Sequence, residues 1–81
     1  MKCVLIDPVA TGENLKKLIG WRDKKVKDVQ EALGFETPQA VYMWLHGDRV
    51  PTIHNLVMLA DFLDVMVDDI IITKHAGKER R

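Results

Sequence analysis

Hydrophobic residues recur at three- and four-residue spacing along most of the chain, which is the period of a helix with one buried face. This spacing predicts five short helices, at about residues 13–23, 26–33, 37–46, 52–63 and 67–72. Ahead of them, Val4, Leu5 and Ile6 favour an extended segment, and Pro8 disfavours helix just before it. We expect no strand after residue 10.

The predicted fold class is therefore all-α, a bundle of five helices with a short extended N-terminal arm. We expect the arm to span residues 1–10, the helical domain 11–73 and a basic tail 74–81. The residues expected to face inward are Leu15, Leu18, Ile19, Arg22, Val26, Val29, Leu33, Val41, Trp44, Leu45, Ile53, Leu56, Leu59, Ala60 and Leu63.

Glycine and Thr/Pro pairs mark the helix ends in the middle of the chain. Gly34 and Gly47 are suited to the left-handed conformation that ends a helix. Thr37-Pro38 and Pro51-Thr52 are suited to start a helix. The threonine hydroxyl can accept a hydrogen bond from a backbone N–H of the first turn, and proline has no backbone N–H that would need an acceptor there. We expect Thr37 and Thr52 to be the caps, and Thr11 or Gly12 to start the first helix. The third helix has only about two turns and is too short to be stable alone, so its outer face is the candidate functional surface.

Charge is balanced in sum but not along the chain. Twelve basic and twelve acidic residues give a formal net charge of zero. Residues 11–31 hold six lysines or arginines against four acids, whereas residues 61–69 hold four aspartates and no base. Such a dipolar surface can still present a basic patch to phosphates, although an ordinary mixed surface explains the same numbers.

Several function classes find no support in the sequence. No apolar run approaches the roughly 18 residues of a membrane span, and a single cysteine, Cys3, cannot form an internal disulfide, which fits a reducing cytoplasm. Phosphate-cradling glycine loops and nucleophile motifs are absent. The histidines lack metal-ligand spacing, and the aspartates suit helix caps and solvated surface; these residues are His46, His54, His75, Asp61, Asp64, Asp68 and Asp69. We expect no enzyme, cofactor, metal site, membrane contact or small-molecule substrate.

A set of framework positions resembles the lambda-repressor-like helix-turn-helix domains of the Xre/Cro type. The likeness covers roughly residues 12–72. Its residues are Val29, Leu33, Gly34, Val41, Trp44, Gly47, Pro51, Leu56, Leu59, Ala60, Leu63 and Val65. The resemblance implies a five-helix DNA-binding domain of a bacterial or phage transcriptional regulator, with double-stranded DNA as partner and a homodimer as the usual assembly.

Three departures from that family pattern bear on the interpretation. Val26 replaces the glutamine that commonly contacts the DNA backbone, and the interval from Gly34 to Gly47 is one residue longer than usual. Ile19 and Leu45 stand where the family often has a buried Arg–Glu pair. Replacing both members of such a pair with packed hydrophobic residues is often neutral, whereas removing one costs about 3–5 kcal/mol.

The resemblance places the third helix, residues 38–46, in the major groove. Gln39 is then a base-reading residue, because its amide both donates and accepts as adenine requires. Tyr42 is expected to reach sugar or phosphate, Met43 a thymine methyl group, and His46 a phosphate or its own helix end. Thr37, at the expected cap just before the helix, is also counted among the DNA-binding residues. The alternatives are a solvated side chain for Gln39, and partial burial or a protein contact for Tyr42 and Met43.

Phosphate contacts are expected at the edges of this surface. Lys25 and Lys27 begin the second helix, whose N-terminus favours phosphate, and Arg49 and Thr52 follow the third. We expect only about half of these to touch DNA, so that one domain binds weakly and with strong salt dependence. Useful affinity would then require a two-fold dimer on paired half-sites.

Trp44 is expected in the core and Trp21 at a rim or interface. Ile70, Ile71 and Ile72 cannot all face inward from one helical turn. We expect the N-terminal arm and this C-terminal end either to pack together or to pair across a two-fold axis.

A protein-interaction module on the same fold, such as an antirepressor or an antitoxin-like partner, is the competing function. Neutral net charge, Val26, and the apolar and aromatic residues near the third helix favour it.

Overall fold

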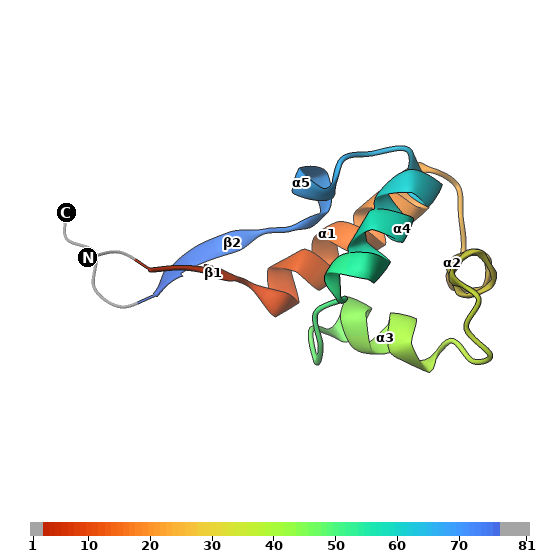
Figure 1. The fold of residues 1–81 in the computed structure, drawn as a ribbon, viewed down its shortest axis with the longest axis horizontal. Coiled ribbons are helices and arrows are strands. Elements are labelled where there is room, and N and C mark those ends of the chain that lie inside the picture. Colours follow the sequence, from red (N-terminus) through yellow and green to blue (C-terminus); the bar gives the residue numbers. More distant parts are fainter. Residues whose placement is uncertain (1–2, 77–81) are drawn as a thin grey trace.

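The computed structural model describes residues 3–76. Within that range the chain forms five helices and two strands (Figure 1). In chain order they are β1 (Cys3–Ile6), α1 (Pro8–Trp21), α2 (Val26–Leu33), α3 (Gln39–His46), α4 (Ile53–Leu63), α5 (Val67–Ile70) and β2 (Thr73–Ala76). The helices pack together at one end, and the two strands extend away from them as a ribbon (Figure 1), which gives a molecule of 44 × 22 × 20 Å.

The predicted helical stripes form the hydrophobic core. Its buried members are Leu15, Ile19, Val29, Leu33, Val41, Trp44, Leu56, Leu59, Ala60, Leu63 and Ile70. The ring of Phe35 packs edge-on against Trp44 at a centroid distance of 5.8 Å, which confirms the core position of that tryptophan. The inward position predicted for Ile53 is wrong: this side chain is 79% exposed. Residues 52–54, around the start of α4, are all exposed, because no neighbouring element covers them.

Helix α1 begins earlier than the sequence pattern predicts. Asp7 is its N-cap and accepts a hydrogen bond from the Ala10 N–H at 3.1 Å, with Pro8 at the start of the helix. The expected start at Thr11 or Gly12 is therefore wrong. Aspartate at the N-cap followed by proline is a strong helix start, and the chain uses this pair to turn directly from strand to helix.

The C-terminal strand β2 is the second correction, because no strand was expected after residue 10. It pairs antiparallel with β1, with Val4 opposite His75 and Ile6 opposite Thr73. The basic tail expected over residues 74–81 begins inside this strand, and residues 77–81 lie outside the described residues. The arm and the C-terminal end thus pack together within one chain, one of the two expected arrangements.

Polar groups on α1 hold the ribbon and α5 in place. The Thr11 hydroxyl donates to the Ile72 carbonyl at 3.2 Å and accepts from the Ile72 N–H at 3.0 Å. The Asp7 N–H donates to the same carbonyl at 2.8 Å. The Asn14 amide donates to the carbonyls of Asp69 and Ile70 at the end of α5. The three Ile residues consequently divide: Ile70 is buried, Ile71 half-buried and Ile72 exposed.

Candidate nucleic-acid interface

A short turn joins α2 and α3, and the glycine that ends each helix behaves as the sequence predicts. Gly34 and Gly47 both adopt the left-handed conformation, with φ of 77° and 82°, and end α2 and α3. The start of α3 differs from the prediction. Pro38 occupies the N-cap position and no side chain caps this end, so the capping role predicted for Thr37 is wrong. The helix starts only at Gln39, and residues 35–38 form the turn.

Two residues of α3 attach it to the core, and four others face away from it. Val41 and Trp44 are buried. Gln39, Tyr42 and His46 are exposed, and Met43 is half-buried. These four residues, with Thr37 and Pro38, line an open hollow of about 490 Å³ on the outer side of the helix. Five of the nine predicted site residues therefore share one surface: Thr37, Gln39, Tyr42, Met43 and His46.

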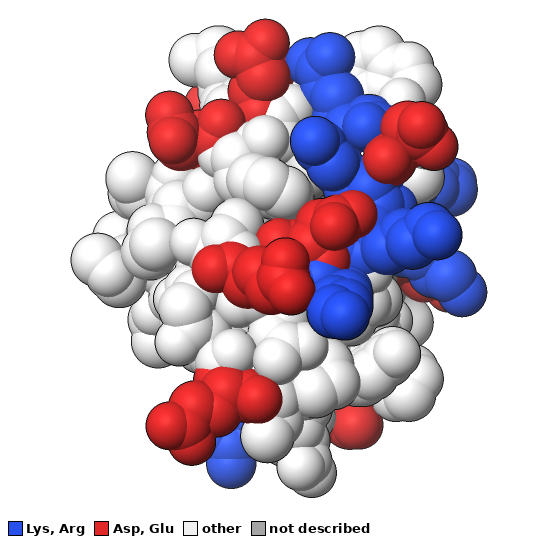
Figure 2. Space-filling model, turned by 90° about the vertical axis from the view of Figure 1, so that its right-hand side faces the viewer, with Lys and Arg blue, Asp and Glu red and all other residues white. Residues whose placement is uncertain are grey.

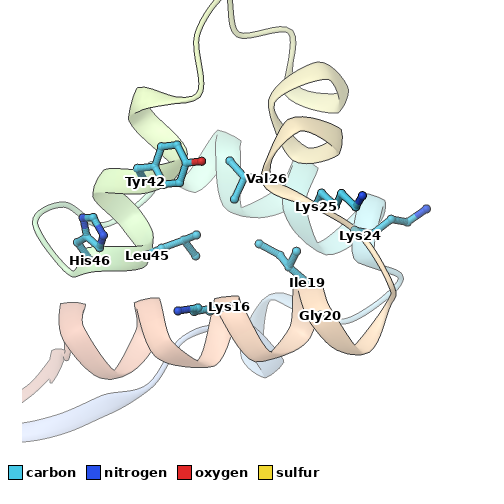
Figure 3. A pocket seen from close by; sticks show the side chains of 9 residues that line it. All are labelled: Lys16, Ile19, Gly20, Lys24, Lys25, Val26, Tyr42, Leu45 and His46. Carbon is cyan, nitrogen blue, oxygen red and sulfur yellow. The ribbon is translucent and has the colours of Figure 1, made fainter.

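A second hollow of about 410 Å³ lies between α1, α2 and α3 (Figure 3). Ile19, Val26 and Leu45 supply apolar side chains from all three helices. Tyr42 and His46 line this hollow as well as the first, and their rings stack at a centroid distance of 6.5 Å with planes 28° apart. This aromatic pair thus forms the boundary between the two hollows.

Lysines form the polar part of the second hollow. Lys25, which was predicted as a site residue, is joined there by Lys16 and Lys24 (Figure 3), two residues that sequence reasoning missed. Lys24 directly precedes Lys25 in the chain, whereas Lys16 lies one helical turn before Gly20 on α1 and reaches the hollow because α1 packs against α3. Lysine and arginine side chains gather in a band on one side of the face around α2, with acids beside them (Figure 2).

One acidic side chain lies at the N-terminus of α2, where the sequence suggested a phosphate contact. The Asp28 carboxylate accepts a hydrogen bond from the Lys25 N–H at 2.8 Å. A carboxylate in the first turn interacts favourably with the same helix dipole that would attract phosphate. The phosphate contact expected at this helix end stays a prediction, and the lysine side chains add positive charge beside it.

The remaining predicted residues are exposed but line neither hollow. Lys27 lies on α2 and Arg49 in the loop after α3. Thr52 caps α4, as predicted, by accepting from the Asn55 N–H at 3.2 Å.

Residues 3–76 show neither a metal site nor a membrane-spanning helix. No group of three or more His, Cys, Asp or Glu side chains converges there as a metal site would require. None of the helices in that range combines the length and apolarity needed to cross a membrane.

Comparison with known proteins identifies the arrangement. A family model described as helix-turn-helix matches residues 15–70. Two solved structures are similar in fold. The restriction-modification controller protein C.AhdI from Aeromonas hydrophila superposes with a TM-score of 0.72 at 22% identity, covering 79% of this chain and 96% of that one. The DNA-binding domain of BldD gives a TM-score of 0.69 at 24% identity, covering 82% and 94%. A search of curated proteins finds no match.

Proposed function

Because the chain belongs to the helix-turn-helix family of the Cro/C1 type, whose members are DNA-binding domains and not enzymes, we propose that it regulates transcription by binding specific sequences in double-stranded DNA. In this proposal α3 is the recognition helix and lies in the major groove.

The exposure of α3 is the observation that carries this proposal. Its outer side is not covered by any other element of the described chain, and the hollow there is lined by Thr37, Pro38, Gln39, Tyr42, Met43 and His46, none of them acidic. Val41 and Trp44 fix the helix to the core from the other side. A helix held this way, with polar and aromatic side chains outward and no carboxylate among them, is suited to the negatively charged groove of DNA.

The roles follow from the chemistry of the exposed groups. Gln39, at the first turn of α3, reads a base edge through its amide. Met43 meets a thymine methyl group, and Tyr42 and His46 contact the sugar–phosphate backbone. Lys25, with Lys16 and Lys24 lining the same hollow, neutralises phosphates near the N-terminus of α2. Contacts to phosphates at the edges of this surface come from Lys27, Arg49 and Thr52.

We further propose that the protein acts as a homodimer. A single domain with few phosphate contacts binds DNA weakly, and a two-fold assembly on paired half-sites multiplies that affinity. Large apolar side chains lie exposed away from α3, including Trp21 at 70% and the ribbon residues Val4 and Leu5, and they support the proposal that part of the surface is covered in solution.

Titration of the protein with duplex DNA at rising salt tests the proposal. We expect measurable binding to random duplex at about 50 mM salt, with log affinity falling linearly against log salt concentration. Selection from random sequence should then yield a preferred site. Lys25→Gln should weaken binding to all sequences and lower the salt slope by about one, whereas Gln39→Ala should relax the preference at one base pair and leave the slope unchanged.

The alternative is a protein-interaction module on the same fold. The zero net charge and the Asp28 carboxylate at the N-terminus of α2 favour it. No binding to any duplex at about 50 mM salt by folded protein would select this alternative over the DNA-binding one.

A further inference from the structure

The β1–β2 ribbon exposes apolar side chains on both of its faces. Side chains alternate between the two faces of a strand, so Val4 and Ile6 lie on one face and Leu5 on the other. Their exposed fractions are 60%, 38% and 48%. A two-stranded ribbon is only marginally stable in water unless a further strand or a packed face supports it. In this molecule the ribbon extends away from the helices (Figure 1), so the helices do not supply that support.

The register shows which backbone groups of the ribbon lack a partner within residues 3–76. The Asp7 N–H donates to the Ile72 carbonyl. Leu5, two residues before Asp7, lies opposite Lys74, two residues after Ile72. In an antiparallel ladder the hydrogen-bonded positions alternate. Leu5 therefore directs its N–H and C=O toward β2, and Val4 and Ile6 direct theirs outward. The outward positions of β2 are Thr73 and His75 by the same rule.

The two edges of the ribbon differ in how readily they accept another strand. Edge strands are commonly protected by charged residues, especially lysine, or by proline. The strand β2 carries Thr73, Lys74 and His75. The strand β1 has neither charge nor proline, and its sequence is Cys-Val-Leu-Ile. The unprotected edge is therefore that of β1, and the strand best suited to pair with it is equally apolar.

We propose that β1 pairs antiparallel with β1 of a second copy of this chain, about a two-fold axis at Leu5. This proposal specifies the surface of the homodimer proposed above. With the axis at Leu5, Val4 lies opposite the partner's Ile6, and Ile6 lies opposite the partner's Val4. Each of these pairs exchanges both of its N–H···O bonds, so all the outward groups of Val4 and Ile6 are satisfied. The ribbon becomes a continuous sheet in the order β2-β1-β1-β2.

A second copy fits this edge better than an unrelated strand because the edge is complementary to itself. Antiparallel pairing about a two-fold axis brings the same residues together from both sides. Here it joins Val with Ile and Leu with Leu, aliphatic pairs that pack well across a ladder. The strands are short, so the interface belongs at the weak end of the range for specific association, and the expected dimer dissociates at micromolar concentrations.

Proline substitution at the two edges tests the pairing. Val4→Pro removes an outward N–H that the β1–β2 ladder does not use, and proline is tolerated on edge strands. His75→Pro is the matched control on the other edge. By sedimentation equilibrium we expect a monomer–dimer equilibrium for the wild type, at least tenfold weaker association for Val4→Pro, and no change for His75→Pro. Thermal unfolding of each variant checks that the bundle is intact.

Cysteine cross-linking tests the register separately. In a Cys3→Ser background, Leu5→Cys places two thiols directly opposite each other, at a non-hydrogen-bonded position where Cβ atoms approach closely. Val4→Cys, the control, faces the partner's Ile6. We expect oxidation to give a covalent dimer of the first variant at least tenfold faster than of the second.

The outcomes separate this proposal from the proposed function. Equal weakening by the two proline variants, or equal cross-linking of the two cysteine variants, would overturn the strand pairing even if the protein is dimeric. A wild-type chain that stays monomeric to millimolar concentration would overturn the pairing and the homodimer together. If the wild-type chain forms the strand pairing but binds no DNA, only the proposed function is contradicted.

Discussion

Gly12 sets the distance between the two helices α1 and α3. A Cβ atom at this position would overlap the carbonyl oxygen of Trp44 and lie 2.8 Å from that of Leu45. Both are backbone atoms, so neither can move aside as the end of a flexible side chain would. The missing side chain lets α1 lie directly against the last turn of α3, the proposed recognition helix.

We therefore expect Gly12→Ala to lower the free energy of unfolding by about 1–3 kcal/mol, the usual cost of overpacking a core. Gly20→Ala is the matched control on the same helix, because a Cβ there meets nothing within 4 Å. Alanine in a helix is favoured over glycine by roughly 0.5–1 kcal/mol, so this variant should be slightly more stable than the wild type. Urea denaturation measures both, and similar effects at the two positions would contradict the close contact.

The two threonines ahead of α3 and α4 make a second comparison at this scale. Thr52 caps α4 through its hydroxyl, whereas α3 has no side-chain cap. Thr52→Ala should cost about 1 kcal/mol of stability, and Thr37→Ala should change it little. The same denaturation experiment decides, and a substantial loss for Thr37→Ala would restore the capping role that the structure does not show.

Among the elements, α1 makes the connections that organise the rest. Its N-terminal half holds β2 and α5 through Thr11 and Asn14. At its C-terminal end the Arg22 guanidinium donates to the carbonyls of Leu63 and Asp64 at 2.7 and 3.0 Å, which ties α1 to the end of α4. The long first helix thus determines where both the bundle and the ribbon lie.

Thr11→Val tests this organising role. Valine keeps the shape of threonine but loses both hydrogen bonds to Ile72 at a site where Thr11 is only 2% exposed. The Ile72 carbonyl still accepts from the Asp7 N–H, but the Ile72 N–H is left without a partner, which costs about 1–3 kcal/mol. We expect the substitution to speed up amide hydrogen exchange, relative to the wild type, more in β1 and β2 than in α4. Uniform acceleration across all elements would show that the ribbon and the bundle open as one unit.

Over the whole molecule, the candidate DNA surface and the ribbon are separate parts. The ribbon leaves the bundle on one side, and α3 begins on the other side, toward α2 (Figure 1), so we expect pairing through β1 to leave the start of α3 uncovered. We expect a duplex with two half-sites to bind at least tenfold more tightly than one with a single half-site of the same length. Val4→Pro should remove most of that difference, and gel-shift titrations would measure it. Equal affinities for the two duplexes would indicate that the domain binds DNA as a monomer.

The accuracy of the sequence predictions follows from whether the deciding interaction is local. The bounds of α2 and α4 were predicted correctly because their ends are marked by nearby residues, Gly34 and Thr52. The strand β2 was missed because its partner lies about seventy residues away, as in the pairing of Cys3 with Ala76. The alternation of Thr73, Lys74 and His75 is too short to indicate a strand by itself.

The same distinction holds for the candidate site. Helical spacing around Val41 and Trp44 predicts an outward set of Gln39, Ala40, Tyr42, Met43 and His46. The structure places four of these together, whereas Ala40 is partly buried against the core. Lys16 was missed because its place at the hollow depends on how α1 packs against α3. Lys24 is next to Lys25 in the chain, and that adjacency is the signal that could have found it. Their contacts with DNA, like those of the other predicted residues, stay predictions.

The order of synthesis gives the ribbon one more consequence. During translation β1 leaves the ribosome before the helices and its partner β2, which ends at Ala76, so the nascent chain carries an unpaired apolar strand while the five helices are being made. Such a segment is prone to aggregate with other incomplete chains. Several closely spaced ribosomes on one messenger RNA would bring those segments together, whereas widely spaced ribosomes would favour the pairing of β1 with β2 of the same chain.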